Sequence, residues 1–590
     1  MPGKLTKPEI AAHVLASVFF IYALLLASGR PLSDPDIFWH LKAGQETVSQ
    51  GHILRSDPFC YTSPAKLSPT QLRGIRSQWL GQALLYLVYA VAGIRGLLMF
   101  RGLFIVMPFV AFYLIANGGR REKSPWTALS IAAPALSILV IEFSNVFERP
   151  QAFSFVFVPI LLYLLERAGR RERRLLHAAL LCLLMALWAN IHGGFILGFG
   201  VIVAWAVGLC IESIAARSLA PLKPVSFYAA AIAASGLNPN GFALLLSYVG
   251  GFVPSHLTMG AQAAAGGDLS ANIIEYKPLW FLIKGLHFTF PYFIFAFFGA
   301  ILIFLIAGKA RPAMISVALF LSLFASIWSR GVAFALIALP FTAYGALANI
   351  GTAKKGAKKR LAVACSGFLI IWAGFAINAW ETDPYAFRPQ AAGHSITSSM
   401  PSEAAGFIAA NNIEGPMLNK VEWGGYLIWR LYPRYKVFLD GQLVNISAAQ
   451  DYLKAIGATP GWRGILDKYR VKFIVTELVN DNAGQAVPLA LALLRPASGW
   501  ELVFCQDNSA VFVKEHSQKR LFELPAEIAY EAMLEEAYGL LAGRPDFKDA
   551  LFTKAIALYG LGRNTESGEI LQALPGAPEP AAFIKSIPQN

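Results

Sequence analysis

Residues 11–27 read AAHVLASVFFIYALLLA, an apolar run whose only ionisable side chain is His13. A run of this length and composition predicts a helix that crosses a membrane. Similar runs recur along the chain, for example at 361–376. Of the 590 residues, 56% are hydrophobic and only 15% are charged, whereas soluble domains carry about 25% charged residues. The composition excludes a wholly soluble enzyme, a disordered chain and a nucleic-acid binder, and it predicts a polytopic α-helical membrane protein.

About eleven crossings are expected. The predicted spans lie near residues 9–28, 94–117, 126–144, 150–166, 173–190, 194–215, 224–237, 289–307, 312–329, 332–350 and 361–379. Dense groups of Lys and Arg occur between spans at 120–123, 167–174 and 354–360, which is typical of cytoplasmic loops. The segment 77–93 is also apolar, but a twelfth crossing would move residues 120–123 outside, so we expect it at the membrane interface.

This orientation places the N-terminus in the cytoplasm and the tail from Glu381 outside, in a bacterial-type inner membrane. Three regions are predicted: a transmembrane domain at 1–380 with outer loops at 29–93 and 238–288, an extracytoplasmic α/β domain at 381–520, and a helical end at 521–590. The α/β domain is inferred from alternating patterns. Helices are expected at 402–411 and 462–469, and strands at 436–440, 472–476, 500–505 and 510–514.

The last region resembles one tetratricopeptide unit, because Ala550–Ala555 is followed by Leu558 and by Leu561-Gly562-Arg563. One such unit cannot bury its apolar face alone. We therefore expect the segment 521–590 to pack on the α/β domain or on a protein partner in the cell envelope.

Isolated polar motifs of the transmembrane domain gather on the side opposite to the basic clusters. Ionisable groups at a membrane are costly and often functional. The motifs are Ser33-Asp34-Pro35-Asp36 with His40, Ser77-Gln78-Trp79, Glu148-Arg149-Pro150-Gln151, Asn190-Ile191-His192-Gly193-Gly194, Asn238-Pro239-Asn240-Gly241, Asn272-Ile273-Ile274-Glu275, and Arg330.

Each motif also has a purely structural interpretation. Ser33 or Asp34 can cap a helix at 36–50 with Pro35 in its first turn, and Asp36 and His40 then share one helical face. Capping alone, and capping combined with a catalytic or metal-binding role for Asp36, both stay open.

The other motifs allow the same two interpretations. His192 before two glycines can simply end a helix, and residues 238–241 suit a turn. Arg149 and Arg330 can extend toward water from a helix end, and Arg149 can pair with Glu148. Glu275 can be an ordinary carboxylate on an exposed loop.

The arrangement resembles the GT-C superfamily of membrane glycosyltransferases, and it is most similar to the catalytic subunits of oligosaccharyltransferases. Asp34-Pro35-Asp36 follows the first span, as their first acidic motif does, and Glu148 lies where their second motif lies. Asn272-Ile273-Ile274-Glu275 keeps the Ile and Glu of their T-I-x-E motif. Glu422-Trp423-Gly424-Gly425-Tyr426 is similar to their WWDYG motif, but the Asp is absent, and the second motif has one acid instead of two.

A second resemblance covers nearly the whole chain. Asp34–Leu41, Trp188–Gly193 and Glu422–Leu427 are similar to D-P-D-x-W-W-H-L, W-x-N-x-H-G and E-W-G-G-Y-L segments of uncharacterised bacterial membrane proteins. That resemblance carries no established activity.

The GT-C resemblance implies transfer of a sugar from a polyprenyl-phosphate or polyprenyl-pyrophosphate donor to an extracytoplasmic acceptor. Asp36 would be the base or acceptor-orienting group, assisted by His40 and His192. Cationic groups would neutralise the departing phosphate. The substrate-binding residues implied are Arg149, Arg330, Trp79, Trp423 and Tyr426.

A divalent metal is a further expectation of the resemblance. Asp36, Glu148 and Glu275 offer oxygen ligands that suit Mg²⁺ or Mn²⁺. A metal-free mechanism that uses Asp36 and the arginines alone stays open beside it.

Two other classes of function remain. A non-catalytic membrane scaffold would recruit an envelope partner through its C-terminal region. A lipid or polysaccharide transporter is less favoured, because transporters generally show internal repeats and mid-membrane charges, and this sequence shows neither.

Overall fold

The computed structural model describes residues 7–32, 34–117, 148–170, 172–252, 298–299, 301–302, 305, 310–328, 331–351, 400–480, 483–515 and 521–589. The chain divides into two compact units. The helical unit comprises Met1–Leu32, Thr47–Ile53 and Arg73–Ser395, and the C-terminal unit comprises Ser33–Glu46, Leu54–Leu72 and Ile396–Asn590. Parts of the predicted outer loop 29–93 therefore fold together with the tail of the chain.

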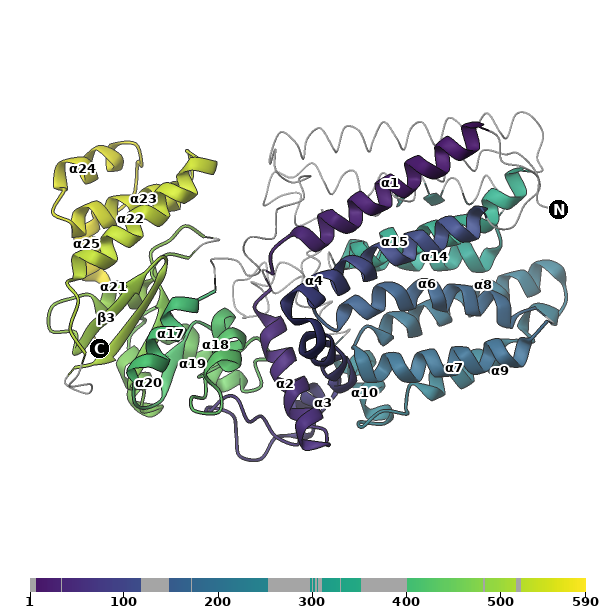
Figure 1. Cartoon of the computed structure of the whole chain (residues 1–590), viewed down its shortest axis with the longest axis horizontal. Helices are drawn as coiled ribbons and strands as arrows, with labels where there is room; N and C mark the ends of the chain where they lie inside the picture. Colours follow the sequence, from purple (N-terminus) through teal and green to yellow (C-terminus); the bar gives the residue numbers. More distant parts are fainter. Residues whose placement is uncertain are drawn as a thin grey trace. The chain divides into compact units, whose positions relative to one another are not determined.

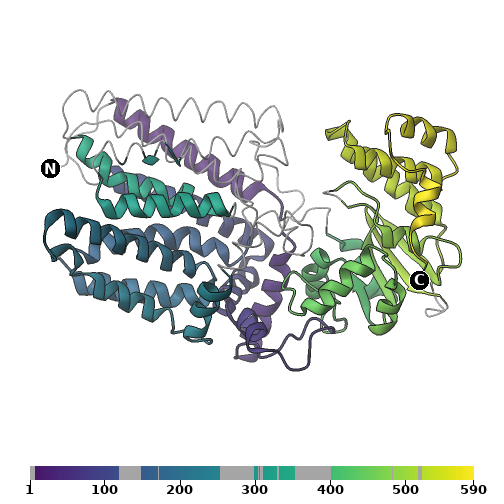
Figure 2. The ribbon, with the colours of Figure 1, turned by 180° about the vertical axis from the view of Figure 1, so that it is seen from behind.

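Long apolar helices lie side by side in the helical unit (Figure 1). The bundle contains α1 (Lys7–Gly29), α4 (Trp79–Asn117), α6 (Gln151–Ala168), α7 (Arg174–Ile191), α8 (Phe195–Ala216), α9 (Val225–Ala234), α10 (Phe242–Ser247), α14 (Pro312–Ile327) and α15 (Gly331–Gly351). Helix α4 packs between α1 and α6, α6 packs on α7 and α15, and α14 packs on α8 and α15. The reverse view shows the same neighbours (Figure 2).

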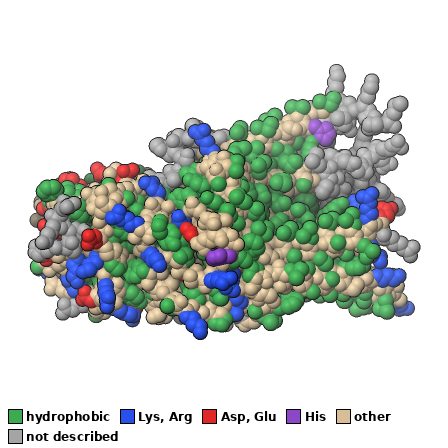
Figure 3. Space-filling view, turned by 60° about the horizontal axis from the view of Figure 1, so that its bottom comes forward, with side chains coloured by type: hydrophobic (Ala, Val, Ile, Leu, Met, Phe, Trp, Pro, Cys, Tyr) green, Lys and Arg blue, Asp and Glu red, His purple; other side chains and the backbone are tan. Residues whose placement is uncertain are grey.

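Four helical segments are long and apolar enough to cross a membrane: Pro69–Tyr113, Gln151–Ala168, Arg174–Ile191 and Phe195–Ala216. Their inward faces bury large side chains such as Phe155, Trp188 and Trp205. Their other faces expose leucines and isoleucines, among them Leu175 and Ile214. Hydrophobic side chains cover much of the bundle surface in Figure 3. An exposed apolar surface of this extent suits contact with lipid.

The described helices agree with most of the predicted spans to within a few residues. The spans predicted at 126–144 and 361–379, and most of 289–307, lie outside the described residues. The segment expected at 77–93 forms the part of α4 that precedes a kink at Gly93. The helix is broken at Gly93, whose φ of 61° and ψ of −156° suit glycine and strain other residues.

A four-stranded sheet of order β1-β2-β4-β3 forms the centre of the C-terminal unit. Strand β1 (Met417–Asn419) runs parallel to β2 (Phe473–Glu477), and β4 (Ser509–Lys514) is antiparallel to both β2 and β3 (Trp500–Gln506). Every residue of β2 is buried, as expected for a central strand covered on both faces. The predicted strands at 472–476, 500–505 and 510–514 are confirmed.

Short helices connect and cover these strands. They are α17 (Ser402–Asn411), the 3-10 turn η6 (Val421–Trp423), α18 (Gly424–Leu431), α19 (Ile446–Ile456), α20 (Trp462–Lys468) and α21 (Pro488–Leu493). The N-terminal part of α2 (Asp36–Gln50) and the start of α3 (Pro69–Arg76) also belong to this unit. The predicted helices at 402–411 and 462–469 are confirmed.

The strand predicted at 436–440 is wrong. Only Val437 pairs, in an isolated parallel bridge with Cys60. The next main-chain amide, of Phe438, donates to the side-chain Oδ1 of Asn419 at 2.8 Å. Because a side chain takes the place of a neighbouring strand, the ladder cannot extend beyond one residue.

The C-terminal helices are α22 (Ala526–Gly543), α23 (Lys548–Gly560), α24 (Asn564–Gln572) and α25 (Pro580–Ser586). Helices α22 and α23 pack together, and α22 also contacts β3. Thr553 Oγ1 of α23 donates to the Gly484 carbonyl at 2.7 Å. The expected packing of 521–590 on the α/β domain is therefore observed, while its tetratricopeptide character stays a prediction.

Candidate functional site

Helix α2 begins at Asp36 because the residues before it satisfy its first turn. Asp34 is buried, and its Oδ1 accepts a hydrogen bond from the Asp36 amide at 3.1 Å. The Phe38 amide donates to the Pro35 carbonyl at 3.3 Å. The positive end of the helix dipole favours a carboxylate in this first turn. The predicted helix 36–50 and its capping by Asp34 are confirmed.

The carboxylate of Asp36 lies against the backbone of Gly441. A Cβ atom built on Gly441 would lie 2.2 Å from Asp36 Oδ1 and 3.1 Å from Oδ2. Asp36 is half-buried and Gly441 is exposed. Residue 441 therefore has to be glycine for Asp36 to keep this position at the surface of the C-terminal unit.

Two further glycines bring α18 against the same region. A Cβ on Gly425 would lie 2.6 Å from the Pro35 carbonyl oxygen, and one on Gly424 would lie 2.4 Å from the carbonyl oxygen of Leu439. Contacts this close exclude any larger residue. The Gly-Gly pair of the E-W-G-G-Y motif thus lets the first turn of α18 approach the start of α2 and the segment before Gly441.

Asp440 is a buried acid directly before Gly441. It is 1% exposed, and its Oδ1 accepts a hydrogen bond from the Gln442 amide at 3.0 Å. Its Oδ2 has no hydrogen-bond partner among the described residues. Burial, and then the negative charges of Asp57 and Asp36, raise the pKa of Asp440 well above its usual value of 3.8. Asp36 therefore borders a second acid that resists ionisation.

Asp57 orders the loop that faces Asp440. Its Oδ1 accepts hydrogen bonds from the amides of Phe59 at 2.9 Å and Cys60 at 3.3 Å, and its Oδ2 accepts from Ser63 Oγ at 2.5 Å. Sequence reasoning missed this acid. An Asp followed by Pro and ending in Ser suggests a turn, but nothing in the sequence links that turn to residue 440.

Aromatic side chains enclose the same region. The rings of Phe38 and Tyr426 meet edge to face with centroids 4.9 Å apart, and Arg430 Nη1 donates to the Tyr426 hydroxyl at 3.0 Å. His40 is 2% exposed, and its ring lies 3.5 Å from that of Trp39. The structure thus brings four predicted site residues into the C-terminal unit: Asp36, His40, Trp423 and Tyr426.

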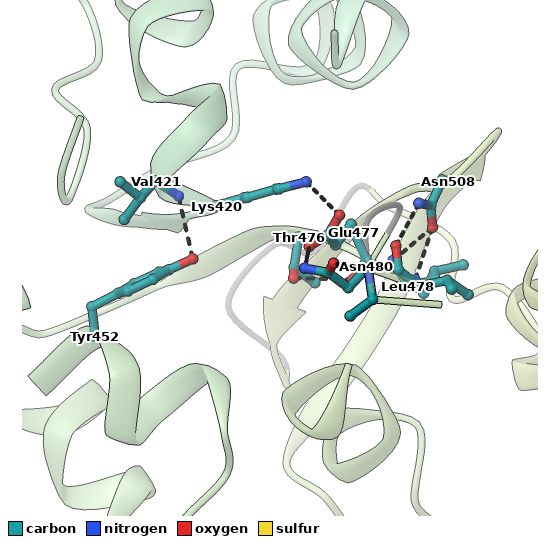
Figure 4. Close-up of polar contacts among 10 residues, drawn as sticks. Lys420, Val421, Tyr452, Thr476, Glu477, Leu478, Asn480 and Asn508 are labelled. Atoms are coloured by element: carbon teal, nitrogen blue, oxygen red, sulfur yellow. Dashed lines mark hydrogen bonds and ion pairs between the residues drawn. The ribbon is translucent and has the colours of Figure 1, made fainter. Parts of the chain in front are cut away.

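An ion pair between a half-buried lysine and a buried glutamate lies where the parallel strands β1 and β2 end (Figure 4). Lys420 Nζ pairs with Glu477 Oε2, and Asn480 Nδ2 donates to Glu477 Oε1 at 3.2 Å. Lys420 Nζ also lies 5.2 Å from the centre of the Trp423 ring. On the other side of η6, the Val421 amide donates to the Tyr452 hydroxyl at 3.2 Å. These contacts fix the turn that carries Trp423 into α18, and sequence reasoning identified neither Lys420 nor Glu477.

Polar motifs also meet at one end of the helical unit. Trp79 Nε1 donates to Asn190 Oδ1 at 2.8 Å, and Asn190 Nδ2 donates to the Leu237 carbonyl at 2.8 Å. A Cβ on Gly81 would lie 2.5 Å from the Ile191 carbonyl oxygen and 2.8 Å from Pro150 Cβ. Four of the predicted motifs, at 77–79, 148–151, 190–194 and 238–241, therefore gather at this end of the bundle.

His192 ends α7 and accepts hydrogen bonds at Nδ1. Trp188 Nε1 donates to Ser154 Oγ at 2.8 Å, Ser154 Oγ lies 2.9 Å from His192 Nδ1, and the Gly194 amide donates to the same nitrogen at 3.0 Å. With the Ser154 hydroxyl donating to Nδ1, the ring carries its proton on Nε2. The imidazole is thus held in one tautomer. This tautomer suits both predicted roles of His192, which are to end the helix and to assist Asp36.

Glu148 forms a buried ion pair with Arg101 of α4. Glu148 is 1% exposed and Arg101 is 5% exposed, and Arg101 Nη2 also donates to the Arg30 carbonyl at 2.5 Å. Pairing of Glu148 with Arg149 or Arg330 was one of the expected alternatives, and Arg149 is half-buried. Arg101 was not predicted as a site residue, because the residues around a single Arg in an apolar helix do not indicate its partner.

The described residues do not test the predicted metal site of Asp36, Glu148 and Glu275. Asp36 belongs to the C-terminal unit and Glu148 to the helical unit, where Glu148 pairs with Arg101. Glu275 and Arg330 lie outside the described part of the chain. No group of three His, Cys, Asp or Glu side chains suitable for a metal ion occurs among the described residues. Binding of Mg²⁺ or Mn²⁺ stays a prediction.

No protein-family model matches the sequence, and no curated protein is significantly similar to it. Solved structures of the oligosaccharyltransferase of the archaeon Archaeoglobus fulgidus are similar to the chain. The AglB complex with an inhibitory peptide and a dolichol-phosphate is 12% identical, covers 97% of this chain and 86% of its own, and gives a TM-score of 0.47. The apo form is 13% identical, with 88% and 77% covered and a TM-score of 0.44.

A third structure of that protein, tethered to an acceptor peptide, gives 13% identity, the same coverages as the apo form and a TM-score of 0.43. At these values the similarity concerns the course of the chain, and function has to be argued from the residues described above.

Proposed function

We propose that the chain is a membrane glycosyltransferase that transfers a sugar or glycan from a polyprenyl-phosphate or polyprenyl-pyrophosphate donor to an extracytoplasmic acceptor. The observation that carries the proposal is the position of Asp36. Its carboxylate is held against Gly441 in the first turn of α2, a few residues after the apolar helix α1. A donor anchored in lipid presents its phosphate at the membrane edge, where such a residue can reach it.

The chemistry of transfer assigns a distinct task to Asp36. Attack on the anomeric carbon of the donor requires an acceptor group that is oriented and relieved of its proton. Asp36 is half-buried, and we assign this task to its carboxylate. Asp440 beside it resists ionisation because burial raises its pKa. We assign the role of proton acceptor to Asp36 and not to Asp440.

The departing phosphate requires positive charge. Arginine is suited to this task because its guanidinium group binds phosphate oxygens in a bidentate manner. Arg149 and Arg330 keep this role as part of the proposal, and Trp79 stays a predicted substrate contact. His192, with its proton on Nε2, supplies a hydrogen-bond donor. The Trp423 and Tyr426 side chains are buried, and Tyr426 packs on Phe38 of α2. We assign them the role of holding the site rather than of touching the acceptor.

The proposal is tested in cells that depend on this chain for a surface glycan. Asp36→Asn removes the proton-accepting carboxylate and is isosteric, so we expect loss of the glycan with normal protein abundance. Asp36→Glu keeps a carboxylate but clashes with Gly441, and it should give an intermediate phenotype. Glu275→Gln and Arg330→Ala extend the test to residues outside the described part. Full retention of the glycan in all four variants would refute the proposal.

A non-catalytic scaffold is the second candidate. It is favoured by aromatic side chains exposed in the C-terminal region, where Phe522 is 89% and Tyr538 is 47% exposed. The two candidate functions are distinguished by comparing a double variant, Phe522→Ser with Tyr538→Ser, with Asp36→Asn. If the chain is a scaffold, the double Ser variant should lose its envelope partner, and Asp36→Asn should leave the glycan unchanged. If the chain is a transferase, the double Ser variant should keep the glycan, and Asp36→Asn should lose it.

A further inference from the structure

Asn419, the last residue of β1, binds the main chain that leads to Gly441. Its Oδ1 accepts a hydrogen bond from the Phe438 amide at 2.8 Å, and its Nδ2 donates to the Leu439 carbonyl at 2.9 Å and the Lys420 carbonyl at 2.8 Å. The side chain is 1% exposed. Both donor protons and one lone pair are used, so the buried amide can adopt only one orientation.

The opposite side of the same segment is held by the loop that follows α2. Thr62 is 8% exposed, and its hydroxyl donates to the Phe438 carbonyl. The Tyr61 amide donates to the Val437 carbonyl at 3.1 Å, and Asn445 Nδ2 donates to the Thr62 carbonyl at 2.7 Å. Residues 437–439 are therefore held by the Asn419 and Thr62 side chains and by the Tyr61 main-chain amide.

The fixed segment ends at the residue that touches Asp36. The Leu439 carbonyl accepts a hydrogen bond from Asn419 Nδ2 and also lies close to Gly424. Only Asp440 separates Leu439 from Gly441, against which the Asp36 carboxylate lies. A displacement of residues 438–439 would move Gly441, and Asp36 would lose the surface that sets its position.

We propose that Asn419, together with Thr62, is a positioning residue for Asp36, acting through the segment 438–441. The inference rests on the proposed function for its catalytic meaning. Neither side chain is required to touch a substrate. Each holds main-chain groups whose placement decides where the carboxylate of Asp36 lies, and small errors of placement lower catalysis strongly.

The test uses the full chain in native membranes and two pairs of variants. Asn419→Asp keeps the acceptor for the Phe438 amide but replaces the donor that faces the Leu439 carbonyl. Its control is Asn508→Asp, because Asn508 likewise binds main chain, at the Leu478 amide at 3.1 Å and the Val479 amide at 2.8 Å (Figure 4). Thr62→Val removes the hydroxyl that binds Phe438, and Thr62→Ser keeps it.

Two measurements are made on every variant. The first is the rate of disulfide formation between Asp36→Cys and Gly441→Cys, with Cys60 replaced by Ala, and it reports the position of residue 36 without any activity. The second is turnover of a polyprenyl-linked sugar, separated into kcat and KM. We expect about tenfold slower cross-linking and about tenfold lower kcat, with little change in KM, for Asn419→Asp and Thr62→Val only.

A pH series adds a signature that a general loss of folding would not give. At low pH the new carboxyl group of Asn419→Asp is protonated and can donate to the Leu439 carbonyl again. Its activity relative to the parent at the same pH should therefore rise as the pH falls. A constant ratio would overturn the assignment of the donor.

The outcomes separate this inference from the proposed function. Equal cross-linking rates for Asn419→Asp and Asn508→Asp, together with equal rates for Thr62→Val and Thr62→Ser, would overturn the positioning role. A parent chain with no turnover, combined with slower cross-linking in Asn419→Asp, would refute the transferase activity and leave the positioning role intact. If Asn419→Asp fails to accumulate, the Thr62 pair decides the question.

Discussion

The carboxylate of Asp36 occupies the space that any side chain at residue 441 would need. The ideal Cβ position of Gly441 lies 2.2 Å from Asp36 Oδ1, well inside van der Waals contact. The two residues come from the second helix of the chain and from the loop after the E-W-G-G-Y helix. The contact therefore makes the start of α2 and the tail parts of a single site.

Replacing Gly441 by Ala should displace Asp36 and lower activity. No positive φ is associated with Gly441, so Ala strains the contact and not the backbone. We expect a decrease in kcat of about 10–100-fold, because a misplaced catalytic group costs this much. Turnover of a lipid-linked sugar by the purified chain measures it. Gly406→Ala is the matched control, because nothing lies within 4 Å of its Cβ position, and equal activity of both variants would contradict the account.

Breaking the buried pair of Arg101 and Glu148 should destabilise the helical unit. Arg101→Leu leaves the Glu148 carboxylate buried without its cation, which costs about 3–5 kcal/mol. Removing both charges, as Arg101→Leu with Glu148→Leu, should cost less than removing one. Unfolding in detergent, followed by proteolysis, measures the difference. The exposed pair of Arg563 and Glu566 is the control, and Arg563→Leu should change stability little.

Asp440 should make the stability of the chain fall as pH rises. In the unfolded chain it loses its proton near 3.8, whereas burial, followed by Asp57 and Asp36, raises its pKa in the folded state. The folded state therefore binds more protons between these two values, and stability contributed by neutral Asp440 is lost as pH rises through the raised pKa. Asp440→Asn cannot ionise and keeps the acceptor for the Gln442 amide.

The free energy of unfolding of Asp440→Asn and the parent is compared from about pH 4 to about pH 7. The advantage of the variant should be small at the acidic end and grow as pH rises. An advantage that is independent of pH would show that ionisation of Asp440 is not its cause.

The topology predicted from the basic clusters can be tested by labelling with a membrane-impermeant maleimide. A single cysteine at the exposed residue Ser402 should react in intact cells, because the tail is predicted to lie outside the membrane. A cysteine at Leu219, exposed in the turn between α8 and α9, should react only after permeabilisation. All five native cysteines are first replaced. The reverse pattern would contradict the proposed orientation.

Local signals in the sequence predicted the elements around the site well. Asp34 and Pro35 indicate that a helix starts at Asp36, and the predicted bounds 36–50 agree with those observed. The apolar spans follow from composition, and the break at Gly93 coincides with the boundary expected between 77–93 and 94–117. Each of these features depends on neighbours within a few positions.

Features that depend on distant partners could not be predicted in this way. The segment 436–440 has the pattern of a strand, yet Asn419 takes the place of its neighbour. Arg101 lies in an apolar helix, and its partner Glu148 is 47 positions away. The glycines at 424, 425 and 441 look like ordinary turn residues until the elements that contact them are known.

The most direct test of the account is the fate of a polyprenyl-linked sugar in vesicles that contain the purified chain. The donor carries a labelled glycan, and the product is the labelled acceptor together with the freed lipid phosphate. The account predicts turnover by the parent chain and loss of at least about 99% of it in Asp36→Asn, at unchanged vesicle content of folded protein. Turnover by Asp36→Asn at the rate of the parent would contradict the central role of this carboxylate.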